Sequence, residues 1–272
     1  MLALHHVRRG RADLKGALRI TFYFFAIDMI LWVTGVHHDG SPQRELSMAL
    51  NFLVRSLGFA VRIWLYYVAL EPLVRRFWPD MLITCSRLIS GRFRNELVGR
   101  DVLIGFLWGA AITLASVIVK RDWERFLQPD LIQGGRLVFS QILNGHQAAG
   151  TGSLFYLTNL LLIRALFRNN WLATAAFTLL MVGCWGENWD DHGQAVLNFL
   201  FFASLGVVYI CFGLLSAFSG LLIWSVLNAF PYGAPGHWYS YPGNLAIAVV
   251  LLLASYAYYT STLAPRIQEL RR

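Results

Sequence analysis

Charged side chains are scarce in this chain of 272 residues: Asp, Glu, Lys and Arg together make up only 14% of it. A soluble domain carries roughly 25%. Because 57% of the residues are also hydrophobic, an ordinary water-soluble domain is excluded. The sequence contains no HExxH, GxSxG or Walker A motif, so the signatures of a zinc protease, a serine hydrolase and a P-loop enzyme are missing. The three cysteines have no CxxC spacing, and no disulfide framework is expected.

Long apolar runs dominate what is present, and they predict an all-α, polytopic transmembrane helix bundle. A span needs about 20 apolar residues. No long soluble stretch separates the runs, so residues 1–272 form a single membrane domain. We expect about eight spans, with six to eight as the range: near 17–36, 48–70, 102–119, 150–167, 171–186 and 243–263, with two short helices in the run 195–230.

Three boundaries within this scheme rest on helix-breaking residues. Pro72 should end the second span at Glu71-Pro72. Two Gly-containing stretches, 144–146 and 150–152, should separate an interfacial or re-entrant piece at 136–143 from the span that follows. The run 195–230 is too long for one span at 1.5 Å per residue, so we expect a break near 211–213. Five small residues should permit close helix packing: Gly105, Gly109, Gly206, Gly213 and Gly220.

The distribution of basic residues predicts that both termini face the cytoplasm. A basic leader occupies residues 1–16, and the connection 71–101 holds six arginines. Loops assigned to the inner side carry far more Lys and Arg than the others, as the positive-inside rule requires. The net charge of +8 therefore points to the anionic lipids of a bacterial inner membrane, and no nucleic-acid partner is expected.

A basic amphipathic helix is predicted near 80–98, on the cytoplasmic membrane surface. Apolar residues recur there at helical spacing, and arginines flank them. The arginines expected to touch lipid or a protein partner are Arg75, Arg76, Arg87, Arg92, Arg94 and Arg100.

Three ionisable residues fall inside predicted spans, where such residues usually have a function. Asp28 and Arg55 lie at similar depths on consecutive antiparallel helices, which predicts an ion pair between them. Arg62 follows Arg55 by seven residues and should share its face. The pair would either lock two helices together or belong to an ion pathway.

A second set of polar residues falls in loops on the predicted outer side. Imidazole and carboxylate groups suit divalent metals, and the candidate ligands are His37, His38, Asp190, Asp191 and His192. Ordinary loop residues are the alternative interpretation. A pigment or haem would need a histidine inside a span, and only His146 approaches that condition. We expect no cofactor; a divalent metal or a pigment is the alternative.

Three stretches resemble one membrane-domain family: 66–79, 86–94 and 97–101. They are similar to the C-terminal multi-pass membrane domain that follows the kinase domain in acidobacterial-type bacterial serine/threonine protein kinases. Shorter similarities lie at 16–19, 37–38, 170–173, 227–231 and 238–239. The resemblance implies a membrane module that anchors, senses or assembles. This chain lacks the glycine-rich loop, HRD and DFG motifs of a kinase, so the resemblance implies no kinase activity here.

These observations favour a non-enzymatic membrane module. We expect an accessory or assembly subunit, or an anchor-sensor, of a larger inner-membrane complex, with the bilayer and other membrane subunits as partners. Two alternatives stay open: a metal-dependent membrane hydrolase that uses the outer-side His, Asp and Glu residues, and a transporter of ions or small solutes.

Overall fold

Helices account for the architecture of this protein throughout the described residues. The computed structural model describes residues 14–36, 40–120, 134–185, 192–230 and 240–263, apart from the side chains of Asp80 and Lys120. The side chain of Leu263 is likewise not described. The elements in chain order are α2 (Leu14–Gly35), α3 (Pro42–Phe77), η1 (Pro79–Leu82), α4 (Ile83–Ile89), α5 (Glu96–Lys120), α7 (Gly135–Phe167), α8 (Asn170–Trp185), α9 (His192–Phe212), α10 (Leu214–Ala229), α11 (Tyr241–Tyr258) and η2 (Tyr259–Leu263).

Six of these helices are long and apolar enough to cross a membrane: α2, α3, α5, α7, α9 and α11. Two shorter apolar helices, α8 and α10, have 16 residues each. Many large hydrophobic side chains are exposed on the outside of the bundle, such as Phe22, Leu114 and Leu252, where lipid would cover them. The protein is therefore a multi-pass helical membrane bundle. The six candidate spans among the described residues lie at the lower end of the expected range of six to eight.

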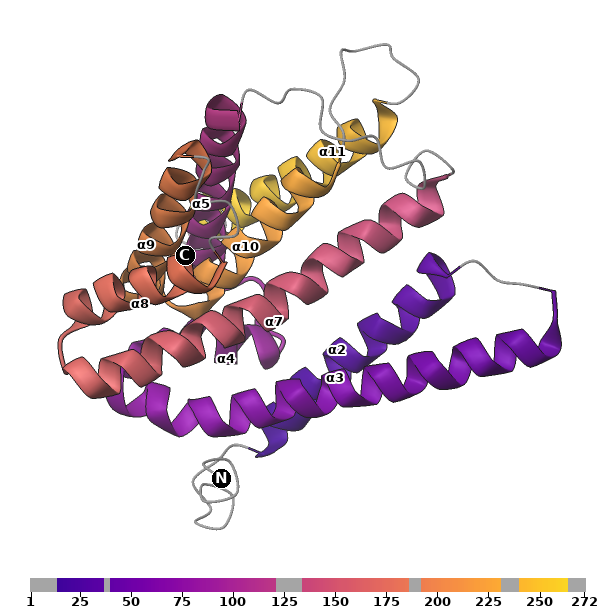
Figure 1. The fold of residues 1–272 in the computed structure, drawn as a ribbon, viewed down its shortest axis with the longest axis horizontal. Helices are drawn as coiled ribbons and strands as arrows, with labels where there is room; N and C mark the ends of the chain where they lie inside the picture. Colours follow the sequence, from indigo (N-terminus) through magenta and orange to yellow (C-terminus); the bar gives the residue numbers. More distant parts are fainter. Residues whose placement is uncertain (1–13, 37–39, 121–133, 186–191, 231–239, 264–272) are drawn as a thin grey trace, which may run out of the picture.

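The long helix α7 lies between two groups of helices (Figure 1). On one side it packs against α2, which pairs with α3; on the other it packs against α10, which pairs closely with α5. Phe177, Leu205 and Tyr209 are fully buried in the main hydrophobic cluster. A smaller cluster joins α7, α10 and α11 around Val138, Val226 and Val250.

Glycines set the tightest helix contact, between α5 and α10. A methyl group at Gly105 would meet Ser219 Oγ and the Ser216 carbonyl, and one at Gly109 would meet the Gly220 carbonyl. A methyl group at Gly206 would meet the Thr174 side chain of α8. The predicted close packing at these small residues is confirmed. The break near 211–213 is also confirmed, because Gly213 separates α9 from α10 with φ of +87°.

Two predicted boundaries are wrong. Pro72 does not end a helix: α3 runs from Pro42 to Phe77 with Pro72 inside it. Proline removes one backbone hydrogen bond, but continuing the helix buries Val74 fully. Residues 136–143 do not form a separate piece, since α7 is one helix of 33 residues. Its glycines are contact points, with Gly150 directly against the Phe24 ring.

The predicted single helix near 80–98 is also wrong. The structure has only η1 and the seven-residue α4 there, followed by a turn in which Gly91 has φ of +82°. Asn95 then begins α5 by accepting a hydrogen bond from the Leu97 N–H at 3.1 Å. Met81 and Leu82 are buried in the main cluster, so apolar side chains expected to enter lipid pack against the protein.

Helix α8 has an exposed tryptophan near each end. Trp171 is 64% exposed and Trp185 is 55% exposed. Asn169 begins the helix, because its Oδ1 accepts hydrogen bonds from the N–H groups of Trp171 (2.9 Å) and Leu172 (3.3 Å). Arg168, with φ of 57°, forms the turn out of α7.

Candidate functional site

A cavity of about 650 Å³ lies between α3, α5, α7, α9 and α10, with Trp185 at the end of α8 also in its lining, and we call it the central cavity. Pockets of about 300–1,000 Å³ that are mostly apolar, with a few polar groups, are typical ligand sites. Polar side chains reach this one from four helices: Arg62 and Tyr66 (α3), Tyr156 (α7), Gln194 and Asn198 (α9), and Asn228 (α10).

Aromatic rings form one wall of the central cavity. Phe201 packs between Trp108 and Trp224, with ring centroids 5.5 and 5.1 Å apart. Trp108 is held in place because its Nε1–H donates to Ser204 Oγ at 3.0 Å. Tyr156 packs edge-on against Phe202 at 5.6 Å. This wall is therefore a rigid, largely apolar surface beside the polar groups.

Several of the polar groups have hydrogen-bonding capacity to spare. In the described part of the chain, the hydroxyls of Tyr66 and Tyr156 make no hydrogen bond, and Arg62 contacts only the Phe59 ring, 5.7 Å from its centroid. Asn198 accepts from Gln194 through Oδ1 at 2.8 Å, which leaves its amide N–H groups available. The central cavity thus presents hydrogen-bond donors.

A separate polar contact joins α2 to α7. Gln147 donates through Nε2 to Asp28 Oδ1 at 2.5 Å, and Tyr23 is hydrogen-bonded to His146 Nε2 at 2.9 Å. Asp28 is only 3% exposed, and its Oδ2 has no hydrogen-bond partner among the described residues. The sequence reasoning missed Gln147. The signal that was available is its place in α7, at a polar point of an otherwise apolar span.

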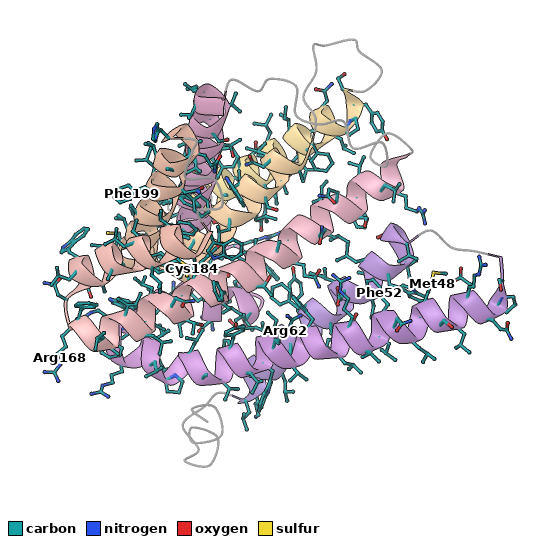
Figure 2. The ribbon with its side chains drawn as sticks, viewed as in Figure 1. Met48, Phe52, Arg62, Arg168, Cys184 and Phe199 are labelled. Carbon is teal, nitrogen blue, oxygen red and sulfur yellow. The ribbon has the colours of Figure 1, made fainter. Side chains whose placement is uncertain are left out.

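The predicted ion pair between Asp28 and Arg55 is not formed, although both residues lie in the described part of the chain. Asp28 points to α7, whereas Arg55 is on an exposed face of α3. Helix α3 turns Ser56 and Phe59 inward and therefore turns Arg55 away from Asp28. Arg62 is also exposed, and it borders the central cavity on the side of α3 that faces α7 (Figure 2).

The predicted metal ligands are not assembled within the described residues. His37, His38, Asp190 and Asp191 lie outside those residues, and His192 is exposed at the start of α9. No group of three or more His, Cys, Asp or Glu that could hold a metal occurs among the residues described. His146, the candidate for a pigment or haem, does lie inside a membrane helix. However, Phe24 and Phe218 pack on its ring, and its Nε2 is hydrogen-bonded to the Tyr23 hydroxyl.

The basic connection 71–101 is more structured than expected. Arg75 forms a salt bridge with the buried Glu71 at 2.9 Å, and Arg100 forms one with the buried Asp101 at 3.0 Å. The other four predicted arginines make no salt bridge among the described residues. Arg87 donates to Asn95 Oδ1 at 3.0 Å and Arg76 lies over the Phe77 ring. Arg92 and Arg94 are exposed. Exposed arginines beside the exposed Phe93 still suit an anionic lipid surface.

Cys85 in α4 should be unusually unreactive. It packs against the main cluster, and this burial, with the nearby Asp101 carboxylate, raises the pKa of its thiol to about 12 from the ordinary 9.0. Because the thiolate is the reactive form, at pH 8 we expect maleimide labelling about 1,000-fold slower than for a thiol of pKa 9. The rate should keep rising with pH up to about 12.

The measurement uses a protein in which Cys184 and Cys211 are replaced by serine. The same protein unfolded in guanidinium gives the reference rate. Asp101→Asn should lower the pKa and speed labelling of the folded protein. A labelling rate that levels off near pH 9 in the folded protein would contradict this account.

The fold and the central cavity define a class: a multi-pass helical membrane protein with a donor-lined cavity inside the bundle. Beyond that class, no family model, no curated protein and no solved structure matches the chain.

Proposed function

We propose that the protein is a non-enzymatic subunit of a larger assembly in the bacterial inner membrane, and that α3 is the helix through which it joins its partner. The observation that carries this proposal is an exposed polar stripe on α3. Arg44, Asn51 and Arg55 follow one another at spacings of seven and four residues, which places them on one helix face, and all three are exposed. We call these residues the α3 stripe.

The length of α3 supports a location of Arg55 within the bilayer. The helix has 36 residues and is about 54 Å long at 1.5 Å per residue, against a hydrocarbon core of about 30 Å. Arg55 is 13 residues from the first residue, Pro42, or about 20 Å along the axis. A helix centred on the bilayer therefore holds Arg55 inside the apolar layer.

An arginine inside the bilayer needs a partner, because a charge facing lipid costs several kcal/mol. Arg55 has no hydrogen bond or ion pair in the described part of the chain, and α3 has no buried residue before Ser56. A transmembrane helix of another subunit, carrying a carboxylate or amide at the matching depth, would supply both the missing polar contact and the missing packing.

The proposal is tested by pull-down from native membranes in mild detergent, read by mass spectrometry. The wild-type chain should recover a stable, stoichiometric set of membrane subunits, and Arg55→Leu should lose at least one of them. Arg168→Leu is the matched control, since Arg168 is an exposed arginine outside α3 and its loss should leave the set unchanged. Recovery of the wild-type protein alone, or the same set with Arg55→Leu, would reject the proposal.

A further inference from the structure

The central cavity carries a positive charge and no negative one, which indicates the charge of the ligand it can bind. Among its lining residues Arg62 is charged and none is acidic. The free hydroxyls of Tyr66 and Tyr156 and the amide of Asn198 add further donors to the same space. Hydrogen bonds from a cation to an anionic oxygen are about twice as strong as neutral ones. The polar side of the cavity is therefore suited to an anionic group rich in acceptors.

The remainder of the lining suits an apolar chain. Phe155, Leu197 and Leu221 line the same space as the aromatic wall. The volume of about 650 Å³ is in the range of drug-sized ligands, which favours a molecule with one hydrocarbon chain over a two-chain phospholipid.

The position of Arg62 also provides a route of entry. Its neighbours Val61 and Leu65 are 54% and 44% exposed, so this part of α3 borders lipid. Arg62 and Ala148 are exposed while also lining the central cavity, which places its mouth at the lipid-facing side of the bundle. A ligand dissolved in the membrane can therefore enter sideways, between α3 and α7.

We propose that the central cavity binds a single-chain amphipathic anion, a long-chain carboxylate, from the membrane. Arg62 binds the carboxylate at the mouth, and the hydrocarbon chain lies along the aromatic wall. Arg62 and the aromatic wall are not residues of the α3 stripe, although Arg62 follows Arg55 by seven residues on the same helix. It would let the subunit respond to free carboxylates in the bilayer.

Tryptophan fluorescence provides the test, because Trp185 and Trp224 line the cavity. A dibrominated long-chain fatty acid, titrated into the purified full chain in neutral detergent, should quench the fluorescence saturably with one site per chain. Arg62→Gln should weaken binding about tenfold or more, as loss of a charge-assisted contact does. Arg55→Gln is the matched control: it lies on the same helix seven residues away, does not line the cavity, and should bind as wild type.

A second variant keeps the test decisive if Arg62→Gln does not fold. A methyl group at Gly152 would make only ordinary contacts, the nearest at 3.6 Å to Tyr156, so Gly152→Leu should fill the cavity and abolish saturable quenching. Four results would overturn the proposal: equal affinity for the Arg62 and Arg55 variants, equal binding of the acid's methyl ester, quenching by brominated phosphatidylglycerol but not by the acid, or quenching that rises linearly without saturation.

Discussion

Gly109→Ala should destabilise the protein by about 1–3 kcal/mol, the usual cost of overpacking a well-packed core. The added methyl group would meet the carbonyl oxygen of Gly220 on α10 and lie 3.1 Å from Ile223 Cβ. A backbone carbonyl cannot turn aside as a side chain can, so α5 and α10 must move apart. Because α10 in turn packs on α7, this displacement would spread through the bundle. The free energy of unfolding in mixed micelles measures the effect.

The matched control is the same substitution at Gly58 on α3. A methyl group there meets nothing within 4 Å, and alanine is about 0.5–1 kcal/mol better than glycine inside a helix. Gly58→Ala should therefore stabilise the protein slightly. Opposite signs for the two substitutions are expected, and equal effects would show that α5 and α10 do not approach as closely as described.

Gln147→Leu should destabilise the protein by about 1–3 kcal/mol, because a buried acceptor would lose its donor. Asp28 would then have neither oxygen hydrogen-bonded within the described part of the chain. Thermal unfolding of the purified protein in detergent, compared with wild type, measures the loss.

The double variant Asp28→Leu with Gln147→Leu separates the polar contact from packing. Replacing both partners with apolar groups of similar size can be nearly neutral, so the double variant should regain most of the stability lost in Gln147→Leu. Strictly additive effects of the two single substitutions would show that the two side chains do not interact.

The helical membrane fold and the places of its apolar segments could be predicted from the sequence, because lipid demands long apolar runs and internal backbone hydrogen bonds. The break at Gly213 was also predictable, since no single span can hold residues 195–230. These features depend on local sequence and on the thickness of the bilayer, and neither requires knowledge of which helices touch.

The predicted helix ends at Pro72 and at the glycines of α7 were wrong because they rested on local sequence alone. Inside a membrane no water satisfies a broken backbone, so α7 continues through its glycines. At Pro72 the helix continues because the turn that follows buries Val74. Gly150 is there because the Phe24 ring packs on it. Only the packing of α2 on α7 reveals this role, and a single sequence does not contain that information.

The candidate site needed the rotation of each helix as well as its depth. Depth alone predicted a contact between Asp28 and Arg55, but the rotation of the helices directs Asp28 to Gln147 and leaves Arg55 exposed. The central cavity draws residues from six helices, and its hydrogen-bond donors could not be grouped before those helices were placed side by side. Arg62 is the one predicted intramembrane residue that borders it.

The two tryptophans of α8 have a consequence for the lipid itself. Trp171 and Trp185 are 14 positions apart on one helix, about 21 Å along its axis, and such rings prefer the headgroup level. With both rings at that level, the hydrocarbon beside α8 is about 9 Å thinner than an ordinary core of 30 Å. Such hydrophobic mismatch has an energetic cost, so the protein should gather in thin, short-chain bilayer regions and deform thicker ones.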